Sequence, residues 1–234
     1  MSFDFSGRCV LVTGATSGIG LAIATGFAAA GAQVTALGLG EPPAAAAAVE
    51  FLTGDATDPD VVPSIVAGLE RLDAVVCCAG IIRRDDEHDP ETFAHVLDVN
   101  LTGTMRTLSA SRERLRASGG AAVATASMLS FVGGPRVPGY AASKGGVVAL
   151  VKSLAVAWAP DVRVNAIAPG WIATRLTAAL REPGGAGDTI LARTPLARWG
   201  VPDDLIGPAL FLCSDHARFI TGAVLPVDGG YLAG

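Results

Sequence analysis

Short apolar runs alternate with helix-length segments along the chain, and this alternation limits the fold more than any other feature. The runs that we predict as strands are Cys9–Thr13, Val34–Leu37, Phe51–Thr53, Asp73–Cys78, Ala121–Ala126, Val162–Ile167 and Ala223–Val227. The segments that we predict as helices are Ile19–Ala30, Ala44–Val49, Asp58–Leu69 (with Asp58 as N-cap and Pro59 at the first position), Glu91–Arg116, Gly139–Ala159 and Val201–Ser214. Parallel strands need a crossover connection, which is usually a helix. The order therefore predicts a doubly wound α/β fold of the Rossmann type, with one parallel sheet and helices on both faces.

The length and composition fit a single domain. The chain has 234 residues, 50% of them hydrophobic, so residues 1–234 can form the core of one α/β domain. A balance of 17 basic against 22 acidic residues gives a net charge of −5, which argues against a nucleic-acid partner. We find no long uncharged apolar span typical of a membrane helix and no signal-peptide pattern at the N-terminus. We therefore expect a cytoplasmic protein without a membrane partner.

The four cysteines are Cys9, Cys77, Cys78 and Cys213, and their spacing fits no metal site. Free cysteine is among the most buried residue types. We predict that all four are reduced core residues. A redox role for the adjacent pair is the alternative.

The least regular segment spans residues 170–200 and is rich in Gly, Pro and Arg. Long irregular segments in compact domains are usually functional or mobile. We predict that this segment is a lid over the substrate.

A glycine-rich loop follows the first predicted strand and opens the first predicted helix. Gly14, Gly18 and Gly20 stand in the pattern T-G-x-x-x-G-x-G. Glycines at such a turn let the backbone approach a phosphate, and the helix N-terminus offers N–H groups and partial positive charge. The loop predicts a dinucleotide site, although glycine turns before helices also occur for packing reasons.

A second constellation lies between Ser127 and Lys144. Tyr140 precedes Lys144 by four residues, so the two side chains share one face of a helix. Ser127 follows a predicted strand, and ligands of open α/β sheets bind at the carboxyl ends of strands. The set points to proton transfer at a hydroxyl or carbonyl oxygen. Taken alone, Tyr140 is better interpreted as an ordinary half-buried tyrosine.

These motifs together resemble the short-chain dehydrogenase/reductase family over nearly the whole chain. The matching elements are Thr13–Gly20, Asp55, Ala79-Gly80, Asn100, Ser127, Tyr140, Lys144 and Pro169-Gly170. One departure is Cys77-Cys78, where the family usually carries an Asn pair. The resemblance implies an NAD(P)-dependent enzyme that interconverts alcohols and ketones. A dehydratase or epimerase of the same fold and a non-catalytic dinucleotide-binding regulator are the alternatives, and the complete Asn100, Ser127, Tyr140 and Lys144 set argues against the regulator.

The resemblance also implies roles for the catalytic residues. Tyr140 would be the general acid/base, with its pKa lowered by the ammonium of Lys144. Ser127 would hydrogen-bond the reacting oxygen, and Asn100 would position Lys144 through water. The alternative for Asn100 is a helix-kinking residue that satisfies backbone groups.

The implied cofactor-binding residues come from several loops. They are Gly14, Thr16, Ser17, Gly18, Ile19, Gly20, Gly38, Leu39, Asp55, Ala56, Ala79, Gly80, Asn100, Tyr140, Lys144, Pro169, Gly170, Ile172 and Thr174. Asp55 would contact the adenine, or else is a turn residue. Thr174 would contact the nicotinamide end, or else caps a lid helix. The second strand ends in Leu37-Gly38-Leu39-Gly40-Glu41, without the Arg or Lys that would pair with a 2′-phosphate, so we expect NAD rather than NADP.

Within the family, the chain is most similar to the dehydrogenases of keto-deoxy sugar acids, the 2-dehydro-3-deoxy-D-gluconate 5-dehydrogenases (also called 2-deoxy-D-gluconate 3-dehydrogenases). The segments that carry this likeness are A-G-I-I-R-R-D-D, A-S-M-L-S-F-V-G-G-P-R-V-P-G-Y, R-W-G-V-P-D-D-L-I-G-P and V-D-G-G-Y-L-A-G. The likeness implies an anionic substrate.

Three arginines flank the strand ends where such a substrate would lie, namely Arg83, Arg84 and Arg136, and a guanidinium suits a carboxylate. Arg83 and Arg84 are alternatively solvated charges balanced by Asp85, Asp86 and Glu87, and His88 belongs to the surface or to the pocket wall. Met128 and Leu129 are expected to line the pocket. Because Val224–Val227 and Tyr231–Ala233 have few obvious partners in one subunit, and relatives commonly form tetramers, we expect a homotetramer.

Overall fold

The computed structural model describes residues 3–41, 48–183 and 185–234. In it, all named strands belong to one parallel sheet in the order β3-β2-β1-β4-β5-β6-β7. The strands are β1 (Cys9–Thr13), β2 (Gln33–Gly38), β3 (Glu50–Thr53), β4 (Ala74–Cys77), β5 (Ala121–Thr125), β6 (Arg163–Pro169) and β7 (Val224–Val227). The predicted doubly wound α/β fold is confirmed, and every predicted strand is present within one or two residues at each end.

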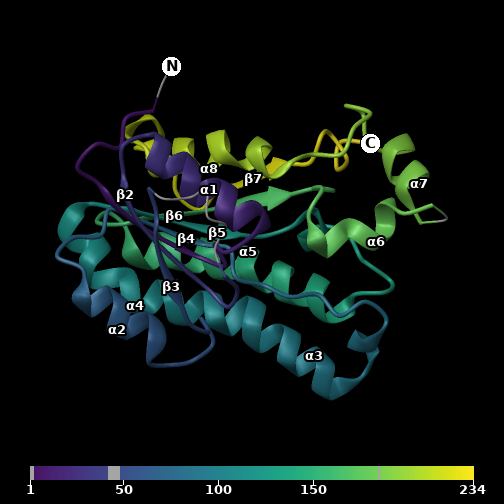
Figure 1. Ribbon diagram of the computed structural model, residues 1–234, viewed down its shortest axis with the longest axis horizontal. Helices are drawn as coiled ribbons and strands as arrows, with labels where there is room; N and C mark the ends of the chain where they lie inside the picture. The colour runs from purple at the N-terminus through teal and green to yellow at the C-terminus, as the bar shows by residue number, and fades with distance from the viewer. Residues whose placement is uncertain (1–2, 42–47, 184) are drawn as a thin grey trace.

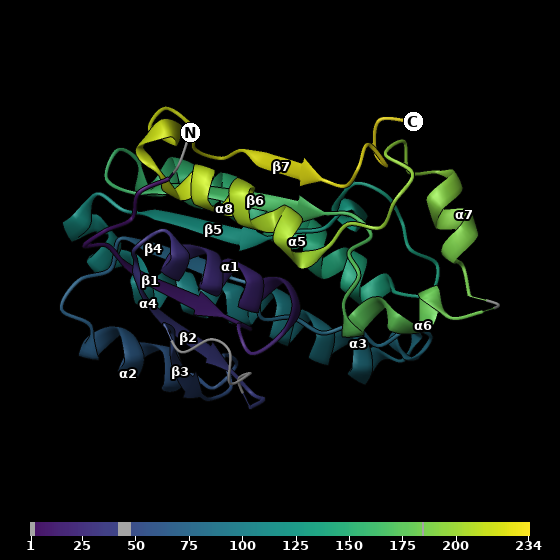
Figure 2. The ribbon, with the colours of Figure 1, turned by 45° about the horizontal axis from the view of Figure 1, so that its top comes forward.

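Helices cover both faces of the sheet (Figures 1 and 2). One face carries α1 (Gly18–Ala29) and α8 (Ile206–Cys213), which bury side chains such as Ile23, Phe27 and Leu212. The other face carries α2 (Val61–Gly68), α4 (Gly103–Ser118) and α5 (Pro138–Trp158). The strands are apolar throughout because both faces are covered, as in buried parallel sheets.

The strand order reverses between β1 and β4, and this reversal creates the crevice in which ligands of such sheets bind. Gly14, directly after β1, has a φ of 65°. A Cβ at Gly14 would lie 2.5 Å from the backbone nitrogen of Ala79, in the loop after β4. Only glycine therefore lets the two loops meet at the switch point.

The long helix predicted over Glu91–Arg116 is wrong in detail. The structure divides it into α3 (Pro90–Leu97), a π-helical segment (Asp98–Thr102) and α4. The widened turn places the buried Asn100 at the break, and π segments often occur at functional sites. A π-helical turn adds one residue to the helix and leaves the spacing of apolar residues on either side unchanged. The sequence pattern therefore predicts one continuous helix.

Other helix boundaries also differ. Asp58 and Pro59 do not begin α2, which has Asp60 as its N-cap residue, because the Asp58 carboxylate accepts a 2.9 Å hydrogen bond from the backbone N–H of Asp60 in a turn. The helix predicted over Val201–Ser214 begins as a 3-10 turn (Pro202–Leu205) before α8. Residues 44–47 of the helix predicted over Ala44–Val49 lie outside the described residues.

Helix α5 is long and apolar enough to cross a membrane by length and composition alone. Its buried residues, including Val147, Val151 and Leu154, belong to the core beneath the sheet, which accounts for its apolar composition. The segment predicted as a lid holds a 3-10 turn (Arg175–Thr177) and the short helices α6 (Ala178–Arg181) and α7 (Gly187–Ala192). These two helices lie beyond the carboxyl ends of β5 and β6 (Figure 2).

Candidate active site

A cavity of about 390 Å³ opens at the carboxyl ends of the strands. Ser127 and Met128 enter it from the end of β5, and Tyr140 enters from the first turn of α5. Ile172 and Thr174 border it after β6, and the lid segment supplies Leu176, Leu180, Ile190 and Arg193. The cavity thus brings together residues that lie far apart in the chain, most of them apolar.

Tyr140 and Lys144 lie one turn apart on α5, as their spacing predicts. The Nζ atom of Lys144 is 5.7 Å from the centroid of the Tyr140 ring. The same atom donates a 2.7 Å hydrogen bond to the carbonyl oxygen of Thr125 at the end of β5. Lys144 is only 4% exposed, and burial lowers its pKa from 10.5 to about 8. Below that pH it places a positive charge beneath the tyrosine.

The expected lowering of the Tyr140 pKa does not occur in this structure. Burial is the largest influence and raises the pKa of Tyr140, while the Ser127 side chain and the positive charge of Arg84 lower it in part. A nearby positive charge was expected to lower the pKa of Tyr140. The removal of the phenolate from water has the larger effect and raises that pKa.

Ser127 is fixed at the end of β5 by a compact set of hydrogen bonds. Its Oγ accepts a 3.1 Å bond from the N–H of Leu129, and its own N–H donates a 3.2 Å bond to Oγ of Ser130. Ser130 in turn donates a 2.8 Å bond to the carbonyl oxygen of Lys144. Ser130 therefore ties the Ser127 turn to the helix that carries the tyrosine. Sequence reasoning missed it, although its place three residues after Ser127 is a capping-box spacing.

Asn100 is buried at the π-helical break and anchors two neighbouring segments. Its Oδ1 accepts a 2.8 Å hydrogen bond from the N–H of Ile81, and its Nδ2 donates 3.0 Å bonds to the carbonyl of Ile81 and to Oγ of Ser143. A Cβ built on Gly80 would lie 3.2 Å from Asn100 Oδ1 and 3.6 Å from Lys144 Nζ. Asn100 thus satisfies backbone groups, which was its alternative interpretation, and Gly80 lies next to both Asn100 and Lys144. The water link to Lys144 stays a prediction.

The glycine loop has the shape that a dinucleotide phosphate needs. A Cβ at Gly20 would lie 2.3 Å from the carbonyl oxygen of Gly14, so the turn admits no side chain there. Gly18 has a φ of 57° and faces the methyl group of Thr174. In the described part of the chain, Ser17 makes no side-chain capping bond and the first turn of α1 holds no acidic residue. The first N–H groups of α1 are therefore suited to binding an anion such as a phosphate.

The end of β2 is the predicted place for the adenosine ribose. A Cβ at Gly38 would lie 2.7 Å from Oγ1 of Thr16, so these two residues touch. Leu39 follows and is 71% exposed. Asp55 accepts a 2.8 Å hydrogen bond from the N–H of Thr57, which is the turn role given as its alternative, and Ala56 beside it is buried. Contact of Asp55 with the adenine stays a prediction.

Cys77 and Cys78 stand where the family usually carries an Asn pair, and burial removes their thiols from water. Burial raises the pKa of Cys77, and raises that of Cys78 to about 11. The hydroxyl of Thr125 donates a 3.3 Å hydrogen bond to Sγ of Cys78. All four cysteines are free. The prediction of core residues holds for Cys77 and Cys213, whereas Cys9 and Cys78 are half-buried.

The structure separates the three candidate arginines. Arg84 lines the cavity, and its guanidinium donates a 2.9 Å hydrogen bond to the carbonyl of Leu176 in the lid segment. Arg136 also borders the cavity but forms an ion pair with Asp85. Arg83 is exposed and does not line the cavity. No carboxylate of the described residues forms an ion pair with Arg84, and burial lowers the pKa of its guanidinium.

One interpretation of the neighbouring charges needs correction, and the surface position expected for His88 is confirmed. Glu87 is not a solvated counter-charge for the arginines, because it is 1% exposed and its carboxylate accepts backbone hydrogen bonds from Arg83 and Tyr140. His88 is exposed and its Nε2 lies 2.9 Å from the carbonyl oxygen of Pro135. The 53-residue separation between Glu87 and Tyr140 hides this contact from sequence patterns.

Arg193 is a cavity residue that sequence reasoning missed. Its guanidinium carbon lies 4.6 Å from the ring centroid of Tyr231, and both residues line the cavity. Tyr231 was expected to have few partners within the subunit. It is instead buried, and its ring also packs edge-on against Trp171 at 6.3 Å. Residues near the C-terminus therefore complete the wall of the site.

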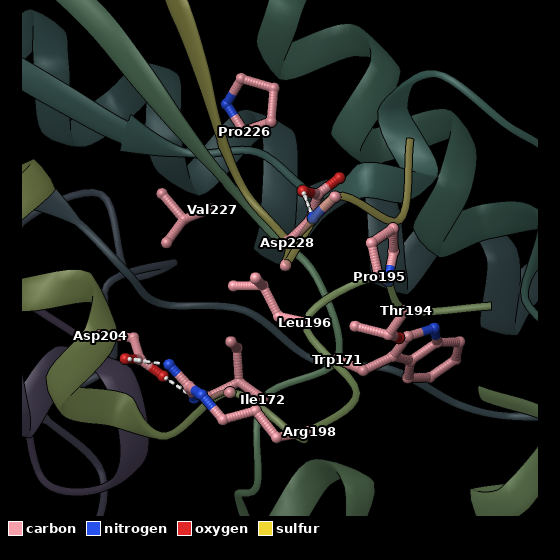
Figure 3. A pocket seen from close by; sticks show the side chains of 13 residues that line it. Trp171, Ile172, Thr194, Pro195, Leu196, Arg198, Asp204, Pro226, Val227 and Asp228 are labelled. Atoms are coloured by element: carbon pink, nitrogen blue, oxygen red, sulfur yellow. Dashed lines mark hydrogen bonds and ion pairs between the residues drawn. The ribbon is translucent and has the colours of Figure 1, made fainter. Parts of the chain in front are cut away.

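A second cavity of about 470 Å³ lies on the other side of Trp171 and Ile172, which border both spaces. Figure 3 shows Arg198 and Asp204 paired along its edge, with hydrogen bonds of 2.7 and 2.9 Å. Among the described residues, Nε1 of Trp171 is the one buried side-chain polar atom without a hydrogen-bond partner. The nearby Gly170 must be glycine, because a Cβ there would lie 2.6 Å from Cα of Asp228.

Comparisons with known proteins identify relatives over nearly the whole chain. A family model described as enoyl-(acyl carrier protein) reductase matches residues 14–232. The 2-dehydro-3-deoxy-D-gluconate 5-dehydrogenase of Pseudoalteromonas atlantica is 40% identical, with 98% of each chain covered. The galactitol 2-dehydrogenase (L-tagatose-forming) of Cereibacter sphaeroides is 38% identical over 98% of this chain and 96% of its own. A provisionally named NAD(P)-dependent gluconate 5-dehydrogenase from Beutenbergia cavernae, crystallised with NADP at low occupancy, superimposes with a TM-score of 0.94 at 42% identity over the whole of both chains.

Proposed function

The chain belongs to the short-chain dehydrogenase/reductase family and is an NAD(P)-dependent oxidoreductase acting on CH–OH groups. We propose that its substrate is a keto-deoxy sugar acid such as 2-dehydro-3-deoxy-D-gluconate or 2-deoxy-D-gluconate, which it oxidises or reduces. The observation that carries the proposal is the position of Arg84. It brings a guanidinium without an acidic partner among the described residues into the cavity that holds Tyr140 and Ser127. Such a group suits the carboxylate of a sugar acid.

The residues of the site account for the proton transfer. When bound, the nicotinamide supplies the hydride acceptor or donor. Tyr140 takes the proton from the substrate hydroxyl during oxidation and returns it during reduction. Ser127 donates a hydrogen bond to the same oxygen, and Lys144, held by Thr125, favours the phenolate through its charge. The mostly apolar cavity wall limits water around this transfer.

We infer that the preferred cofactor is NAD. The chain has no Lys or Arg between Arg8 and Arg71, a stretch that includes the glycine loop and the ends of β2 and β3. A 2′-phosphate at the end of β2 would therefore lack a cationic partner from this stretch, and Glu41 would repel it. The relative from Beutenbergia cavernae was crystallised with NADP, and this observation favours NADP instead.

The segment from 170 to 200 is proposed as the lid of this site. Leu176, Leu180, Ile190 and Arg193 from it line the cavity. Arg84 is bonded to the carbonyl oxygen of Leu176, so the substrate arginine and the lid meet. Movement of this segment would admit the substrate and then exclude water.

A second candidate is a neutral sugar or polyol, favoured by the 38% identity to the galactitol dehydrogenase. Both candidates are tested by one screen in which NADH and NADPH absorbance is followed with sugar acids, polyols and simple ketones. Highest kcat/KM on a keto-deoxy sugar acid with NAD supports the proposal. If kcat/KM is highest on a neutral polyol, the substrate is a neutral sugar or polyol and the sugar-acid proposal is wrong.

A further inference from the structure

Glu87 is a buried carboxylate that the reaction itself does not use. It lies in a 3-10 turn (Asp86–His88) and is 1% exposed. Its Oε1 accepts a 2.7 Å hydrogen bond from the N–H of Arg83, and its Oε2 accepts a 2.7 Å bond from the N–H of Tyr140. One side chain thus joins the backbone next to Arg84 to the backbone of the proposed acid/base.

The position of Tyr140 in α5 makes this bond consequential. Tyr140 is the third residue of a helix that starts at Pro138, so its N–H has no acceptor within the helix. The carboxylate of Glu87 supplies one and also places negative charge at the positive end of the helix. Glu87 also packs closely against the first turn of the helix, because a Cβ at Gly139 would lie within van der Waals contact of its Oε2, at 3.4 Å.

Three further contacts join the same two segments, residues 83–88 and 135–140. The N–H of Asp85 donates a 2.9 Å hydrogen bond to the carbonyl of Arg136, and the two side chains form an ion pair. Nε2 of His88 lies 2.9 Å from the carbonyl oxygen of Pro135. Asp85 adopts a φ of 71°, a left-handed conformation that costs energy outside glycine and persists only where surrounding contacts hold it. Segment 83–88 is therefore held in one shape against the start of α5.

We propose that Glu87 is a positioning residue that sets the distance and orientation between the guanidinium of Arg84 and the phenol of Tyr140. The inference rests on the proposed function, in which these two groups bind opposite parts of one substrate. The other contacts between the segments are exposed and attach to residues 135 and 136, outside α5. Glu87 alone among them is buried and reaches the tyrosine itself.

The test is the substitution Glu87→Gln. Glutamine keeps the size of the side chain, but its NH₂ group cannot accept a hydrogen bond, so one of the two N–H groups loses its acceptor. We expect kcat to fall about 10- to 100-fold on any substrate that the wild type uses, as misplacement of reacting groups predicts. We also expect KM to rise for a sugar acid and to stay unchanged for a neutral polyol, because only the acid uses Arg84.

The matched control is Asp86→Asn, which removes the neighbouring charge in the same turn. It should leave both parameters at the wild-type value. Each variant is compared per active site by NADH titration, so that partial unfolding is not mistaken for a slower reaction. A merely structural carboxylate predicts fewer active sites with unchanged kcat and KM per site, and that result would overturn the proposal.

Glu87→Asp serves as a second variant where the first does not fold. It keeps the charge near the helix terminus, but its shorter side chain cannot reach both N–H groups. A fall in kcat per site supports positioning, and wild-type kinetics contradict it. The proposed substrate is judged separately on the wild type: if the wild type turns over only neutral alcohols, the sugar-acid assignment fails while the effect of Glu87 on kcat is still measured.

Discussion

The ammonium nitrogen of Lys144 lies 5.7 Å from the ring centroid of Tyr140 and is bonded to the carbonyl of Thr125 at 2.7 Å. The lysine is thus anchored to the end of β5, one helical turn from the tyrosine. Burial moves the two pKa values in opposite directions, lowering that of Lys144 to about 8 and raising that of Tyr140. In this structure the pair therefore favours the neutral form of each group more than either would in water.

Tyr140→Phe should abolish turnover while NADH binding stays near the wild-type value. The change removes the phenol oxygen that carries the proton and leaves the ring in place. Steady-state rates and a fluorescence titration of NADH measure the two effects. Retention of a tenth of the wild-type kcat, a barrier change of about 1.4 kcal/mol, would exclude Tyr140 as the acid/base.

Lys144→Met should flatten the pH dependence of stability in the protein without cofactor. The pKa of Lys144 is lowered on folding, so the unfolded chain binds more protons between about pH 8 and 10.5, and the free energy of unfolding rises with pH across that window. The gain is on the order of 3 kcal/mol at about 1.4 kcal/mol per pKa unit, and the variant lacks it. Urea denaturation at pH 7, 8, 9 and 10 checks this on both proteins. Parallel curves would contradict the burial of a charged lysine.

Leu39→Arg should raise kcat/KM with NADPH relative to NADH. Leu39 is 71% exposed at the end of β2, where a guanidinium can reach a 2′-phosphate. A substitution at Gly38 is a poorer test, because its Cβ would lie 2.7 Å from Oγ1 of Thr16. Leu39→Gln is the control for the loss of the apolar side chain. A wild type that already prefers NADPH would disprove the proposed cofactor preference.

Arg84→Gln should lower kcat/KM for a sugar acid by about 10- to 150-fold, the loss of a charge-assisted hydrogen bond of roughly 1.5–3 kcal/mol. Activity on an uncharged ketone should change little. Arg83→Gln is the matched control, since Arg83 is adjacent but exposed outside the cavity. Arg136→Gln should have a smaller effect than Arg84→Gln, because Asp85 neutralises Arg136. Equal kinetics for Arg84→Gln and the wild type on the acid would place the carboxylate elsewhere.

The protein should assemble as a homotetramer with a mass of about four times 23.6 kDa. Strand β7 forms one edge of the sheet and is only partly buried, and Phe219 just before it is fully exposed. Exposed apolar side chains beside a sheet edge mark a surface suited to association. Light scattering across micromolar concentrations measures the mass. A monomer throughout that range would contradict the prediction.

The strands and the relative positions of Tyr140 and Lys144 could be predicted because their signals are local. An apolar run such as Ala121–Thr125 is readable within one strand, and the spacing of Tyr140 and Lys144 within one helical turn. The turn of Gly14 after β1 is likewise readable within the loop itself. The break at Asn100 was not readable, because a single inserted residue in a helix leaves the apolar pattern on either side intact.

The sequence by itself determined the parallel sheet, the dinucleotide loop and the Ser127–Tyr140–Lys144 set, since backbone geometry converts short spacings into positions on a strand or helix. Only the tertiary structure decided which arginine enters the cavity and which groups the Glu87 carboxylate contacts. Arg83 and Arg84 are adjacent and chemically identical, and their different surroundings arise from segments near Leu176 and Tyr140. The direction of the Tyr140 pKa was decided in the same way, because burial depends on every element that packs around the phenol.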